Sequence, residues 1–104
     1  MSNETEVLWL DETRVVSLRE LVDLSGLRET ELLELVHSGA IPASGPPGAG
    51  YSFGAHVITV ARTACRLRND FELDTRGLSV ALRLLERVRD LEEEIARLRA
   101  ELPR

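Results

Sequence analysis

The sequence predicts a mainly α-helical protein with the element order of a winged helix-turn-helix domain, extended by a long C-terminal helix that forms a short coiled coil. A capping signature at Ser17–Glu20 and a break at Ser25-Gly26 define a pair of short helices. A Gly- and Pro-rich run precedes the alternating segment Tyr51-Ser-Phe53, which predicts a small β hairpin or wing. Apolar residues then recur with heptad spacing up to Leu102, which predicts the long helix.

The length and charge of the chain limit its organisation and its partners. With 104 residues it can bury one modest core, so we expect one compact domain: residues 1–74 form the winged helix-turn-helix region with a third long helix, and residues 75–104 form a dimerisation helix. The net charge is −5, from 18 acidic residues and 13 basic residues that are all Arg. This balance disfavours nonspecific binding to nucleic acid or to anionic membranes and favours a basic protein partner.

The N-terminus and the cysteine content favour a cytoplasmic protein. Residues 1–6 are polar and acidic, which is not the basic-then-apolar order of a signal peptide. No run of apolar residues approaches the roughly 18 needed for a membrane helix. The single cysteine, Cys65, lies in an apolar stretch and is expected to pack in the core.

The first half of the chain predicts a strand and two helices. Residues 6–12 are partly β-prone, and Trp9 is expected to anchor them to the core. The first helix begins near Leu18 behind its capping box, and the second runs from Glu29 to His37. This spacing is that of a helix-turn-helix pair.

Two further helices are predicted after the wing. One runs from about Ala55 to Phe71, and Asp74 is the expected N-cap of another that continues to about Leu102. The expected core face of the first of these helices consists of Val57, Val60, Ala61, Ala64, Leu67 and Phe71, which step at three and four residues.

The last helix carries the clearest periodicity in the chain. Apolar residues at spacings of 4, 3, 4, 3 and 4 are typical of a coiled-coil seam, so we expect a homodimer. The alternative is that this stripe packs on the other helices of its own chain. Charges beside the seam suit parallel and antiparallel pairing, so the orientation stays open. The predicted dimerisation residues are Leu84, Val88, Leu91, Ile95, Leu98 and Leu102.

The second helix of the pair has the wrong charge for reading DNA. Glu29, Glu31 and Glu34 face a single arginine, Arg28, where a helix entering the major groove needs Lys or Arg to neutralise phosphates. We therefore interpret these carboxylates as an exposed acidic strip that contacts a protein partner. The alternative is that they form an ordinary solvated helix face.

A second acidic cluster lies around the bend between the two long helices. Asp70, Glu72 and Asp74 are candidate partner contacts, although Asp74 also suits a helix cap. Arg66, with Arg68, could bind a carboxylate of the partner or extend along the surface of a buried helix face.

Residue patterns for chemistry are missing from the sequence. His37, His56 and Cys65 lack the spacing of metal ligands, so we expect no metal site. The Gly-rich run 45–50 contains prolines and no following Lys-Ser or Lys-Thr, which argues against a phosphate-binding loop. No nucleophile and base are paired by spacing. We expect neither an enzyme nor a cofactor.

Three segments, Phe53–His56, Arg66–Asp74 and Gly77–Leu85, resemble the corresponding parts of the CbpM chaperone modulators, a bacterial family related to the MerR helix-turn-helix regulators. The resemblance extends over nearly the whole chain. It departs from the family at Arg28, where a serine cap is usual, and at Gly54, where an aspartate commonly follows the wing aromatic.

The resemblance implies a small adaptor that binds the J-domain of a CbpA-type, DnaJ-like co-chaperone and blocks its stimulation of DnaK. J-domains present a basic helix, which an acidic chain complements. The alternative function is that of a MerR-like DNA-binding transcription regulator. The wing segment from Gly39 to Gly54 contains no Lys or Arg to hold a DNA backbone, so nucleic acid is not the expected partner.

Overall fold

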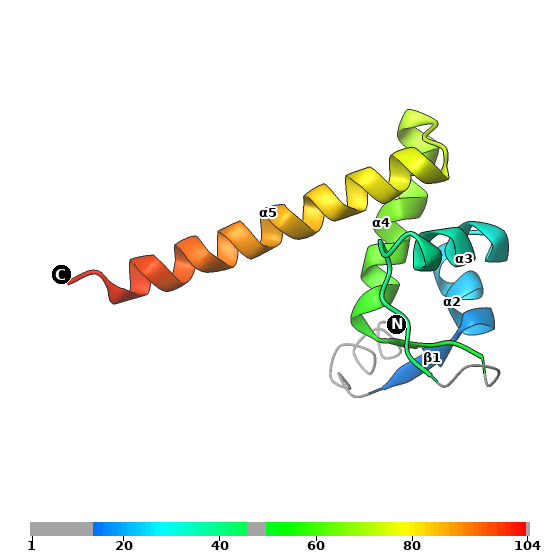
Figure 1. The fold of residues 1–104 in the computed structure, drawn as a ribbon, viewed down its shortest axis with the longest axis horizontal. Coiled ribbons are helices and arrows are strands. Elements are labelled where there is room, and N and C mark those ends of the chain that lie inside the picture. Colours follow the sequence, from blue (N-terminus) through cyan, green and yellow to red (C-terminus); the bar gives the residue numbers. More distant parts are fainter. Residues whose placement is uncertain (1–13, 46–49, 104) are drawn as a thin grey trace, which may run out of the picture.

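The structure, a computed structural model that describes residues 14–45 and 50–103, is a small helical body with one long helix projecting from it (Figure 1). The elements follow in the order β1 (Val15–Ser17), α2 (Leu18–Ser25), α3 (Glu29–His37), β2 (Ser52–Gly54), α4 (His56–Phe71) and α5 (Thr75–Glu101). The mainly helical fold class is confirmed. The strand expected at residues 6–12, with Trp9, lies outside the described residues.

The helix pair α2–α3 is built as its capping signals predict. The Ser17 hydroxyl accepts the backbone N–H of Glu20 at 3.1 Å, and the Glu20 carboxylate accepts the backbone N–H of Ser17 at 2.9 Å. Gly26 ends α2 with a φ of 86°, a left-handed conformation that suits a residue without Cβ. Its Cβ position would lie only 3.0 Å from the Sγ of Cys65, so both the turn and the packing favour glycine here.

The wing strand is present, but its main partner was not predicted. β2 pairs antiparallel with β1, so that Val16 lies opposite Phe53 and both side chains are buried. β1 is only three residues long and continues directly into α2. It is therefore too short to show the alternation of apolar and polar residues that predicts a strand. An isolated bridge between Ser44 and Ser52 joins the wing loop to β2.

The hydrophobic core lies between the two-stranded sheet, the helix pair and the inner face of α4. Its buried members are Val16, Leu21, Leu27, Leu32, Leu35, Ala40, Ile41, Phe53, Val57, Ile58, Ala61, Ala64, Leu78 and Leu82. The expected core face of α4 is correct except at its last position: Phe71 is 67% exposed. The final turn of α4 extends beyond the core, which the helical period alone does not reveal.

Helix α5 contacts the body through its N-terminal half. Leu78 and Leu82 are its buried residues, and the Ser79 hydroxyl donates a hydrogen bond of 2.9 Å to the Ser38 hydroxyl at the end of α3. The Arg83 guanidinium donates to the backbone carbonyl of Ser38. From residue 83 onward every described residue of α5 is exposed, and the helix extends away from the body (Figure 1).

The apolar stripe of α5 does not face the body. With about 100° of rotation per residue, Val88, Leu91 and Leu98 lie roughly 160–240° around the helix axis from Leu82, which faces the core. The stripe residues are 40–66% exposed, Leu91 least and Leu102 most. The alternative in which this stripe packs on its own chain is therefore wrong for the described structure.

Candidate functional site

The three glutamates of α3 do not form a single exposed strip. Glu29 and Glu34 are exposed, as predicted, but Glu31 is only 6% exposed. The expected exposure of Glu31 is therefore wrong. The reason is its helical position, because Glu31 lies one turn before the buried Leu35 on the inward face of α3.

The buried Glu31 carboxylate is the centre of a small polar network. Its Oε1 atom accepts the backbone N–H of Arg28 at 2.9 Å and the Nε–H of Arg28 at 3.3 Å. The same oxygen forms an ion pair with Nη1 of Arg68, which is on α4. The Arg28 side chain has no acceptor that could cap the N–H groups of α3. The Glu31 carboxylate instead accepts the backbone N–H of Arg28, which is the second hydrogen bond of a capping box.

Arg68 is fixed from several sides, which identifies it as a structural residue. Its Nη2 lies 3.6 Å from the Sγ of Cys65, and its Nε donates to Oδ1 of Asn69 at 3.2 Å. The sequence predicts that Arg66 and Arg68 bind a carboxylate of the partner or extend along a buried helix face. Arg68 instead binds a carboxylate of its own chain, whereas Arg66 is exposed. The two residues are 37 positions apart in the chain, so no local sequence pattern could predict this ion pair.

The network keeps the Glu31 carboxylate ionised. Burial by itself raises its pKa, but hydrogen bonds from Arg28 and the positive charges of Arg68 and Arg28 outweigh burial. The pKa of Glu31 therefore lies below its ordinary value of 4.5. A carboxylate that is already paired in this way is not available to a partner.

The second acidic cluster lies at the elbow between α4 and α5, which we define as residues 70–74. Asp70, Glu72 and Asp74 are exposed there. Asp74 caps α5, as predicted, because its Oδ1 accepts the backbone N–H of Gly77 at 2.8 Å. Glu72 has a φ of 53° and turns the chain from one helix to the next.

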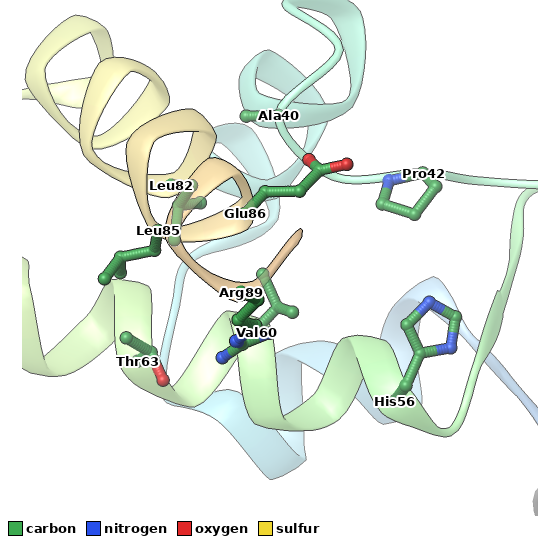
Figure 2. A pocket seen from close by; sticks show the side chains of 9 residues that line it. All are labelled: Ala40, Pro42, His56, Val60, Thr63, Leu82, Leu85, Glu86 and Arg89. Atoms are coloured by element: carbon green, nitrogen blue, oxygen red, sulfur yellow. The ribbon is translucent and has the colours of Figure 1, made fainter. Parts of the chain in front are cut away.

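A hollow of about 180 Å³ lies between α4, residues 82–89 of α5 and the segment that follows α3. Its floor is mainly apolar, and Figure 2 shows the Glu86 side chain extending toward the segment with Pro42, with His56 on the α4 side. The lining residues are Ala40, Pro42, His56, Val60, Thr63, Leu82, Leu85, Glu86 and Arg89. Sequence reasoning missed this feature, since its residues come from three separate segments.

Among residues 14–45 and 50–103, no group of three His, Cys, Asp or Glu side chains is placed to hold a metal ion. Over the same ranges, no helix combines the length and apolar character needed to cross a membrane.

Comparison with known proteins gives relatives of two related kinds. The family model described as MerR HTH family regulatory protein matches residues 16–100. A chaperone modulatory protein CbpM from Escherichia coli O1:K1 / APEC is 35% identical over 80 residues, which cover 77% of this chain and 79% of the relative. CbpM of Salmonella arizonae is 38% identical and CbpM of Escherichia coli O139:H28 is 34% identical, each with the same coverage.

Replacing Glu31 by Gln should destabilise the protein, whereas replacing the exposed Glu34 by Gln should not. We expect a loss of about 1.5–3 kcal/mol for Glu31→Gln, because the hydrogen bonds to Oε1 lose their charge assistance and Arg68 loses its counter-charge. Glu34→Gln should stay within about 0.5 kcal/mol of the parent. Urea unfolding followed by circular dichroism measures both values.

The same pair of variants gives a pH test. Since the pKa of Glu31 is lower in the folded state than its ordinary value of 4.5, its contribution to stability is fully present above that value and is lost as pH falls through the folded-state pKa. The stability difference between the parent and Glu31→Gln should therefore shrink on acidification below that pH. A difference that grows on acidification would contradict the assigned ion pair.

Proposed function

Because the chain belongs to the CbpM chaperone modulatory proteins, within the MerR helix-turn-helix proteins, we propose that it binds the J-domain of a CbpA-type, DnaJ-like co-chaperone and blocks its stimulation of DnaK. The chaperone-modulating role follows from the relatives named above. The J-domain as the partner comes from the resemblance and from the surface charge of the chain.

The observation that carries the proposal is the charge on the outward side of α3. This is the helix that a helix-turn-helix regulator inserts into the major groove, and here it exposes Glu29 and Glu34. Carboxylates at these positions repel phosphates and attract a basic protein surface. The structure thus favours a protein partner on a scaffold that elsewhere supports DNA binding.

Inhibition in this proposal requires no bond chemistry. The bound chain covers the J-domain surface that DnaK would otherwise contact, so modulator and DnaK compete. Exposed carboxylates steer the encounter with the basic surface, and such steering acts mainly on the association rate. It is screened within about 10 Å at 0.1 M ionic strength, so binding should slow as salt is added.

We also propose that the chain is a homodimer joined through the stripe of α5. An exposed apolar stripe of this length is an association surface, and its flanking charges are complementary. In a parallel pair, Arg87 would face Glu92 of the partner copy and Glu94 would face Arg99. An antiparallel pair could instead place Glu92 opposite Arg99. In either orientation the stripe lies on the side of α5 away from its own body.

Charge reversal tests the contribution of α3. The double variant Glu29→Arg/Glu34→Arg should associate with the J-domain about tenfold more slowly at low salt, with a smaller difference at high salt. The matched control is Glu86→Arg/Glu93→Arg, which changes the net charge equally on α5. Stopped-flow association rates measure both. Equal slowing in the two variants would show a general charge effect and would remove α3 from the proposed interface.

Sedimentation velocity tests the dimer. Leu91→Asp/Leu98→Asp places charges within the stripe and should give a monomer, because desolvating unpaired carboxylates in an apolar seam is costly. Ala96→Asp/Ala100→Asp introduces the same residues on the opposite side of α5 and should leave the dimer intact. A stripe variant that sediments like the parent would refute the assignment of the seam.

A further inference from the structure

Phe71 is a large apolar side chain that the fold leaves uncovered. The period of α4 predicts it in the core, yet it is 67% exposed at the last residue of the helix. Leu67, one turn earlier, packs against the core. Exposed side chains on isolated surface positions are common, so exposure alone does not make Phe71 a contact residue.

The backbone around Phe71 is fixed on both sides. Leu73, two residues later, packs against the core, and Asp74 caps the first turn of α5. The intervening Glu72 has a left-handed backbone, which turns the chain by a defined angle. Phe71 is therefore presented at a structured elbow, where α4 meets α5 at the upper right of Figure 1. A side chain presented in this way loses little backbone freedom on binding.

The charged residues next to Phe71 in the chain are all acidic. Asp70 and Glu72 flank it directly, and no basic residue occurs between Arg68 and Arg76. The guanidinium of Arg68 is engaged by Glu31, so it does not offset these carboxylates at the surface. An exposed aromatic ring bordered by carboxylates complements an apolar depression bordered by Lys or Arg.

We propose that Phe71 is the apolar anchor of the partner interface and that it inserts into an apolar depression on the basic surface of the J-domain, with Asp70 and Glu72 facing basic side chains at its border. This inference rests on the proposed function and deepens it by placing the apolar part of the partner interface at the elbow, in addition to the exposed charges of α3. On α3 only Glu29 and Glu34 are exposed, because Glu31 is buried. The elbow, by contrast, combines exposed carboxylates with a large exposed apolar side chain. Aromatic side chains are enriched in interface cores for this reason.

Phe71→Ala tests the anchor, with Val15→Ala as the matched control. Val15 is 61% exposed on β1, so both substitutions remove a similarly exposed apolar side chain. Each full-length variant and the parent would be titrated by calorimetry with the J-domain of the co-chaperone from the same organism, and each would be examined by sedimentation velocity. We expect Phe71→Ala to weaken J-domain binding by about 10- to 30-fold. Val15→Ala should leave it unchanged, and all three proteins should sediment alike.

Each other outcome has a separate meaning. Unchanged J-domain affinity in Phe71→Ala would overturn the anchor and leave the proposed function standing. Altered sedimentation of Phe71→Ala would also overturn it, because Phe71 would then belong to contacts between copies of this chain. Equal weakening of J-domain binding in both variants would show a general effect of lost apolar surface. That outcome would overturn the assignment of the anchor to Phe71. A parent protein that does not bind the J-domain would reject the proposed function together with the anchor.

Discussion

The ion pair between Glu31 and Arg68 joins the helix pair to the third helix, and the arrangement of the candidate surfaces depends on it. One carboxylate oxygen caps the start of α3 through the Arg28 N–H and holds the guanidinium of α4. Because Glu31 is buried, its charge must stay paired, since an unpaired charge at the same place would be strongly destabilising. The interaction also affects which charges are available at the surface: it buries Glu31 and pairs the partly exposed Arg68, whereas Glu29, Glu34 and the elbow carboxylates are exposed.

Local signals in the sequence predicted most of the helical elements. Ser17 and Glu20 marked the start of α2, Gly26 its end and Asp74 the start of α5, because caps are determined by neighbouring residues. Contacts between distant segments could not be read in the same way. The pairing of β1 with β2 and of Glu31 with Arg68 depends on how the elements pack.

The two errors in exposure have different physical origins. The charge of Glu31 predicted an exposed side chain, although its spacing of four residues from Leu35 places it on the inward face of α3. Phe71 was read from its period, but a helical period does not show where the core ends. For the α5 stripe, the period correctly identified one continuous apolar face, and the structure adds that this face points away from the body.

A helix-turn-helix scaffold with an acidic second helix is the basis of the proposed role. The fold supplies a rigid pair of helices and a wing, and the exposed carboxylates change the kind of partner that this surface attracts. In the proposed homodimer, the apolar stripe of α5 is a separate association surface. Partner binding and self-association can therefore occupy different parts of the same small chain.

Calorimetric titration of the purified protein with the J-domain of its own organism's CbpA-type co-chaperone, and in parallel with random duplex DNA, tests the central claim most directly. At physiological ionic strength we expect saturable binding to the J-domain and no binding to DNA. Binding to DNA without binding to the J-domain would contradict the chaperone-modulator assignment and support a DNA-binding regulator.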